Sequence, residues 1–162
     1  MVALFPPTNA IVTVAWLSQR VTGFTEAMVA TRLPRKAVDW AATGFIQVTP
    51  ITGVPDVDIP VRHPVVQVDC WAVKLDAEGN ITNKPPVGRA NVLAERVRIA
   101  TEDGALYGAR VTTPAGYENA IVLSAYPLTE PVEITDDPSG YARITLDLAL
   151  DWVRVPPTEE KG

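Results

Sequence analysis

A predicted strand that leads into a predicted helix is the feature that most constrains this fold. Residues 64–72 alternate in character, as in a strand with one face covered. One face carries Val66, Val68, Cys70 and Ala72, and the other carries Gln67, Asp69 and Trp71. After a polar insert, the chain from Gly88 onward has apolar residues at helical spacing. This stripe consists of Ala90, Leu93, Ala94, Val97 and Ala100. Such a pair requires a helix packed on a sheet.

The first half of the chain predicts a further helix and a short strand. The helix begins after the capping candidates Thr8 and Asn9 and continues to about Thr22. Its expected apolar face consists of Ile11, Val14, Ala15, Ser18 and Val21. Residues 24–39 are ambiguous between helix and loop. Residues 45–49 predict a short strand.

Prolines determine the interpretation of residues 50–64. They recur at nearly regular spacing, as Pro50, Pro55, Pro60 and Pro64. Because proline cannot donate a backbone hydrogen bond, we expect an extended connection here rather than a helix or a central strand. Residues 76–80, within the later insert, are expected to form a turn because they are rich in turn-forming side chains.

The last third of the chain predicts strands. The clearest covers residues 143–152, where apolar and polar side chains alternate throughout, and others are expected at 120–126 and 132–135. Together the elements predict an α+β fold, with a mostly antiparallel β-sheet of four to six strands packed against two helices. With 162 residues, we expect a single domain over 1–162 that ends in a short flexible tail at 156–162.

Composition argues against several classes of protein. The formal net charge is −5 and the basic residues are scattered, so we expect no specific binding to nucleic acid. The single cysteine permits neither an intramolecular disulfide nor a cysteine-rich metal site. The N-terminus does not have the pattern of a signal peptide, and no apolar run reaches the roughly 18 residues needed for a membrane span. These features predict a cytoplasmic product without membrane contact.

No constellation of catalytic residues emerges, and we expect no enzyme activity, no metal and no cofactor. A dyad of Cys70 and His63 is disfavoured because the intervening strand spans about 23 Å and puts the two side chains on opposite faces. Cys70 is expected in the core and His63 in a loop. The aspartate pairs in residues 56–58 and 136–137 lack the further oxygen ligands that calcium requires.

This chain resembles the tail terminator proteins of long-tailed, siphovirus-type bacteriophages, particularly those that infect actinobacteria. In that family a strand ending in V-x-V-D-x-W-A precedes a loop and an A-x-x-L-A-x-x-V helix, and the matching residues here are 66–72 and 90–97. The resemblance covers roughly residues 8–152. The chain departs from the family in its proline-rich stretch 50–64 and in its insert 74–88.

The resemblance implies a structural role in the virion. Tail terminators form a hexameric ring that caps the tail tube, stops its polymerisation at the length set by the tape measure protein, and joins the tail to the head–neck connector. The implied partners are therefore further copies of this chain, the tail tube protein, the head–tail connector protein and the tape measure protein. The implied location is the neck-proximal end of the tail, after assembly in the host cytoplasm. DNA would pass through the ring without specific binding.

Other functions remain open at this point. Another head–tail connector or a head completion protein would form a ring of similar size and acidity. A free-standing binding module of host metabolism is a further alternative. A small enzyme is disfavoured because an acid, a base and a nucleophile are not found together.

Five residues are candidates for a subunit interface. Trp71 can supply buried area to a neighbour and Asp69 can orient an arginine there, although one of the protein's own helices could equally cover this face. The other three are Arg89, Arg96 and Arg98, on the second predicted helix. They either pair with acids of a neighbouring subunit or form the solvated side of the helix.

Overall fold

The computed structural model describes residues 3–157. The helical elements are α1 (Asn9–Arg20), α2 (Val87–Glu102) and the short 3₁₀ helices η1 (Glu26–Met28), η2 (Ala37–Asp39) and η3 (Gly104–Leu106). The strands are β1 (Val29–Ala30), β2 (Phe45–Pro55), β3 (Arg62–Ala72), β4 (Ala109–Val111), β5 (Asn119–Pro127), β6 (Val132–Glu133) and β7 (Ala142–Val155). The expected α+β fold is confirmed. Most of the predicted tail, from residue 158 onward, lies outside the described residues.

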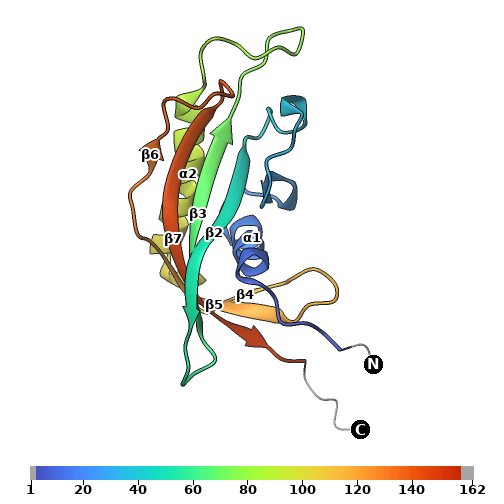
Figure 1. Cartoon of the computed structure of the whole chain (residues 1–162), viewed down its shortest axis with the longest axis vertical. Coiled ribbons are helices and arrows are strands. Elements are labelled where there is room, and N and C mark those ends of the chain that lie inside the picture. The colour runs from blue at the N-terminus through green and yellow to red at the C-terminus, as the bar shows by residue number, and fades with distance from the viewer. Residues whose placement is uncertain (1–2, 158–162) are drawn as a thin grey trace.

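The strands form one curled sheet whose centre is made by the long strands β2, β3 and β7 (Figure 1). The order is β1-β2-β3-β7-β5-β4, and β6 also pairs with β7. Every pair is antiparallel except β1 with β2. Seven strands exceed the expected four to six because β1 and β4, with only two and three residues, have too little alternation to predict. The ambiguous segment 24–39 contains η1, β1 and η2.

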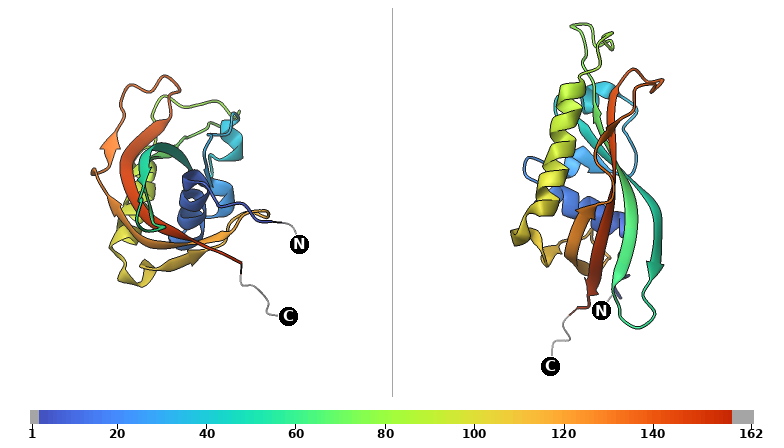
Figure 2. Two further views of the ribbon diagram at one scale, coloured as in Figure 1. Left: turned by 60° about the horizontal axis from the view of Figure 1, so that its bottom comes forward. Right: turned by 90° about the vertical axis from the view of Figure 1, so that its left-hand side faces the viewer.

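Both helices pack on the concave side of the sheet and share one hydrophobic core with it (Figure 2). The predicted stripe of α2 is buried in full. The inward side chains of β3 and β7 meet it, including Val66, Val68, Cys70, Ile144, Leu146 and Leu148. The alternation in residues 64–72 and 143–152 therefore marks the core face correctly. Within the described residues, neither helix combines the length and hydrophobicity needed to cross a membrane.

Helix α1 begins where the sequence predicts, but most of its predicted face was wrong. The Thr8 side chain caps it by accepting a hydrogen bond from the backbone N–H of Ile11 at 3.2 Å, and the helix ends at Arg20. Its fully buried side chains are Val12, Thr13, Ala15, Trp16 and Leu17. The bulky Trp16 and Leu17 fill the hollow of the curled sheet, which rotates Ile11 and its neighbours toward the surface.

Residues 50–64 are not the simple connection that their prolines predict. They continue β2 and β3 as a long hairpin that projects from one end of the sheet (Figure 1). The prolines are tolerated because β1 pairs with only the first residues of β2, so the outer edge of β2 is free beyond them. A register shift between Pro50 and Thr52 accommodates the first proline. His63, expected in a loop, belongs to β3.

Candidate functional site

Asp69 and Trp71 lie on the outer face of β3, away from the core, in a polar network. The Asp69 carboxylate accepts hydrogen bonds from Nε of Arg143 and from the side-chain amide of Gln67, both at 3.0 Å. The Arg143 guanidinium lies 5.1 Å from the centre of the Trp71 ring. The Trp71 indole N–H donates to Oε1 of Gln47 at 3.1 Å. The network therefore ties β2, β3 and β7 together across the outer face.

Trp71 is only 7% exposed because another part of the same chain covers it. It belongs to a small cluster, separate from the main core, that also contains Trp40, Phe45 and Val73. Tyr141 stands edge-on to the Trp71 ring, with the two ring centres 6.1 Å apart. Of the two alternatives left open by the sequence, the structure shows the intramolecular one, with the segment around η2 as the cover. Trp71 and the equally buried Asp69 therefore stabilise the fold and present little surface to a neighbour.

Arg89 also makes contacts within the chain. From the start of α2, its Nη2 donates to the backbone carbonyls of Ala41 and Ala42 at 2.9 and 3.0 Å. Its Nη1 donates to the carbonyl of Val73 at 3.4 Å. Arg89 thereby links α2 to the end of β3 and to the segment that covers Trp71. This role leaves its donors engaged rather than available to a second subunit.

Arg96 and Arg98 lie on the outer side of α2. Arg98 pairs with Glu95 at 2.9 Å and with Glu102 at 2.6 Å, and the hydrogen bond to Glu95 followed by the charge of Glu102 raises the pKa of Arg98. Arg96 packs against Gly23, where a Cβ atom would come within 2.5 Å of its Nη1. The solvated-side alternative therefore describes Arg98, whose charge is already paired on its own helix.

His63 joins the projecting hairpin to β7 through a cluster of polar side chains. Its Nδ1 lies 2.6 Å from Asp151 and its Nε2 lies 3.8 Å from Asp56. The hydrogen bond to Asp151 is the largest cause that raises the pKa of His63. Ser124 donates to the other oxygen of Asp151 at 3.1 Å. Because the aspartate stands between the serine and the histidine, His63 does not contact the hydroxyl, and the group does not have the geometry of a nucleophilic triad.

Cys70 lies in the core, as the sequence predicts. It is fully buried on the inward face of β3, and desolvation raises the pKa of its thiol. A thiol that stays protonated and inaccessible is a poor nucleophile and a poor metal ligand. Within residues 3–157, no three histidine, cysteine, aspartate or glutamate side chains are grouped so that they could hold a metal ion.

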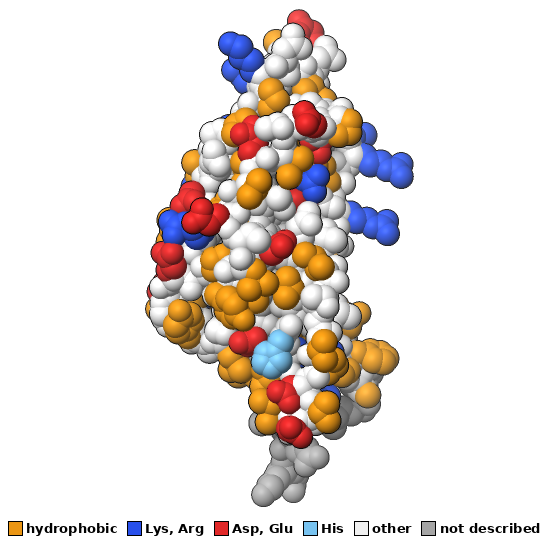
Figure 3. Space-filling model, turned by 60° about the vertical axis from the view of Figure 1, so that its left-hand side comes forward, with side chains coloured by type: hydrophobic (Ala, Val, Ile, Leu, Met, Phe, Trp, Pro, Cys, Tyr) orange, Lys and Arg blue, Asp and Glu red, His pale blue; other side chains and the backbone are white. Residues whose placement is uncertain are grey.

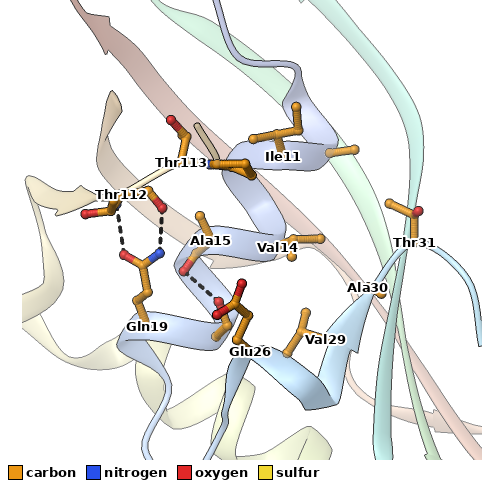
Figure 4. A pocket seen from close by; sticks show the side chains of 13 residues that line it. Ile11, Val14, Ala15, Gln19, Glu26, Val29, Ala30, Thr31, Thr112 and Thr113 are labelled. Carbon is orange, nitrogen blue, oxygen red and sulfur yellow. Dashed lines mark hydrogen bonds between the residues drawn. The ribbon is translucent and has the colours of Figure 1, made fainter. Parts of the chain in front are cut away.

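A groove runs along α1 where the curled sheet stays open (Figure 4). The half-buried face of α1 forms its floor, β1 forms one wall and residues 112–114 form the other. The apolar lining includes Ile11, Val14, Ala15, Val29 and Ala30. Gln19 fixes the second wall, because its side-chain amide exchanges two hydrogen bonds with the backbone of Thr112, at 2.7 and 2.9 Å. The groove has a volume of about 480 Å³.

Exposed apolar side chains gather at two places. The projecting hairpin carries Ile51, Val54, Val57 and Ile59, which are 52%, 76%, 97% and 51% exposed. A second group lies over β5 and β6, where Figure 3 shows hydrophobic side chains near the middle of that face. Its members are Leu123, Tyr126, Leu128 and Val132. Apolar surface of this kind is typical of contacts with another protein. The signal in the sequence was the recurrence of branched apolar residues between the prolines of 50–64.

Comparison of this chain with protein-family models and with curated protein sequences found no match.

Proposed function

We infer that this chain is a structural protein of a phage tail, a tail terminator that forms a ring, caps the tail tube and joins it to the neck. The observation that supports this most is the projecting hairpin of β2 and β3. Burying its four exposed apolar side chains against another protein would remove a large apolar area from water, at about 25 cal/mol per Å². A protein whose task is to bind the end of a tube needs such an arm.

Two further features support a structural rather than a catalytic role. The polar side chains that the described residues bring together are used to hold strands to one another, as in the network of Asp69 and Arg143. The net charge of −5 suits a ring through which DNA passes without being retained. A ring also needs two different complementary surfaces on each subunit, and the curled sheet has different edge strands, among them β1 at one end of the strand order and β6 beside β7.

The hairpin can be tested without disturbing the core. In the double variant Val54→Ser/Val57→Ser, both replaced side chains are exposed, so the fold should remain and binding to purified tail tube ends should fall by on the order of tenfold or more. Val38→Ser on η2 is the matched control, because Val38 is similarly exposed but lies outside the hairpin. Unchanged binding by the double variant, measured by co-sedimentation with tubes, would remove the main support for this proposal.

Phage that lack the protein separate the terminator from its alternatives. Loss of a terminator should give overlong tubes or tails without heads in electron micrographs. Headless tails of normal length would instead identify another head–tail connector or head completion protein. Normal tails joined to filled heads would exclude both functions.

A further inference from the structure

We propose that the acidic strand β6 of one copy of this chain binds the basic free edge of β1 in the next copy, as an antiparallel strand added over the groove of α1. The binding partner is thus a second copy of the chain, joined head to tail. This inference deepens the proposed function, since it names the contact that closes the ring.

The edge strands β1 and β6 lie at the same position along the strand direction of the sheet. One row of paired residues runs from β1 to β6 through Ala30, Gln47, Asp69, Thr145 and Val132. The next row runs through Val29, Ile46, Cys70, Ile144 and Glu133. The strand directions alternate after β2, so β6 runs opposite to β1. A copy placed beside β1, with its sheet in the same orientation, therefore offers β6 in the antiparallel sense. No shift along the strand direction is needed.

The groove lies on the free side of β1. In Figure 4, Val29 and Ala30 stand on one wall, α1 forms the floor and the segment of Thr112 stands across from them. A strand added to β1 would enter this gap and cover the apolar side chains Ile11 and Val14 of α1. Val132 of the added strand would share the outer row with Ala30, so its half-exposed side chain would extend the outer face of the sheet across the contact. The backbone of the added strand would thus close the groove on the side of β1.

Opposite charges accompany the two edges. Residues 31–36, directly after β1, contain Arg32, Arg35 and Lys36 and no acid, and all three bases are exposed. Residues 129–136, around β6, contain Glu130, Glu133 and Asp136 and no base, and these acids are also exposed. Antiparallel pairing brings Glu130, which precedes β6, to the side of Arg32, which follows β1. Complementary charges at the rim of an apolar contact fix its register and its partner.

The competing explanation of these charges is that they protect the sheet edges. Short, charged edge strands prevent unwanted pairing, and β1 and β6 are both short. Protection alone, however, works best when both edges carry the same sign of charge, because identical copies then repel each other. The opposite signs found here favour attraction between copies.

The test is charge reversal on each side, followed by mixing. The variant on the β1 side is Arg32→Glu/Arg35→Glu, and the variant on the β6 side is Glu130→Lys/Glu133→Lys. We expect each variant alone to weaken self-association by on the order of a hundredfold, because like charges then meet at the contact. An equimolar mixture of the two should recover assembly, since each variant then offers the charge that the other lacks. Sedimentation in low salt, where charges are least screened, gives the readout.

Two control variants test whether a change of charge elsewhere alters assembly. Lys84→Glu alters a base in the distant insert 74–88 and should leave assembly unchanged. Asp136→Lys should leave assembly unchanged or strengthen it, because antiparallel pairing brings Asp136, which follows β6, toward Glu26, which precedes β1. Circular dichroism confirms that each variant is folded, as expected for exposed positions.

The outcomes distinguish this contact from the proposed function. Wild-type protein that stays monomeric at high concentration in low salt, or folded reversal variants that assemble as well as wild type, would overturn the contact. Failure of the mixture to assemble would do the same. Assembly that follows these predictions, combined with normal tails in phage that lack the protein, would leave the contact standing and reject the terminator.

Discussion

Asp69 on β3 and Arg143 on β7 are joined across the outer face of the sheet, with Arg143 Nε 3.0 Å from Asp69 Oδ1. The carboxylate side chain is 3% exposed, whereas the guanidinium is 26% exposed. The guanidinium of Arg143 thus covers the carboxylate of Asp69. Asp137 adds a second, longer contact to the same guanidinium, at 3.6 Å. A charge buried in this way depends on its partner for stability.

Arg143→Met should lower the free energy of unfolding by about 2–4 kcal/mol, because it leaves the Asp69 carboxylate buried without its cation. Urea denaturation measures the loss. The double variant Arg143→Met/Asp69→Asn should recover part of it, since the neutral amide costs less to bury. A single variant as stable as wild type would show that water reaches the carboxylate.

Trp71→Ala should destabilise the isolated protein by about 3–5 kcal/mol, because it removes a buried aromatic side chain. The loss should appear in thermal unfolding whether or not other copies are present. Trp71→Phe, which retains part of the ring packing, should lose less. A variant that keeps its stability but fails only in assembly would show that Trp71 belongs to the subunit interface instead.

Leu146→Asp should abolish soluble expression, since the position is fully buried in β7 and an unpaired carboxylate there costs several kcal/mol. Leu146→Ala is the milder comparison, at about 2–5 kcal/mol. Asp147→Ala, one position along on the outer face, should be tolerated much better. Soluble Leu146→Asp protein with unchanged thermal unfolding would contradict the placement of Leu146 on the core face of β7.

The contact of His63 with Asp151 should make stability depend on pH. Its pKa is raised in the folded protein, so the folded state binds the proton more tightly than the unfolded chain does. The stabilisation is therefore complete below the unfolded pKa of about 6.5 and is lost as pH rises through the folded pKa. The effect is small because the pair is exposed. Subtracting the pH profile of His63→Asn from that of wild type isolates it, and parallel profiles would contradict it.

Cys70 should not react with thiol reagents in the native protein. Its thiol is fully buried and its raised pKa keeps it protonated at neutral pH. Reaction with a chromogenic disulfide should appear only as the protein unfolds, at the same denaturant concentration as the loss of circular dichroism. Rapid labelling without denaturant would show that β3 opens locally.

The sequence predicted the elements in which side chains repeat over many residues. The alternation around Leu146 and the stripe around Leu93 both marked core faces, because in each element several apolar side chains repeat on the same face. The two-residue strand β1 contains no period and was missed, whereas the two-residue strand β6 lies within the predicted strand 132–135. They exist because longer neighbouring strands supply their partners.

Interface residues were harder to predict than core residues. Tryptophan is enriched in interfaces and aspartate can orient an arginine there, but both also serve networks within one chain. Only the position of Trp40 and Tyr141 decides between the two for Trp71. The exposed hairpin was missed for a different reason. Its prolines exclude a central strand but not a free edge, and the free edge depends on how short β1 is.

The free edge of β2 has a consequence for how the hairpin survives in a crowded cell. A long, apolar, unpartnered strand is a template on which identical chains stack into fibrils. Pro50 and Pro55 lie in this strand, and each lacks the N–H that a stacking chain would need. The register shift beside Pro50 further interrupts the flat edge. The hairpin can therefore keep its apolar side chains exposed for a partner while its backbone resists amyloid-like growth.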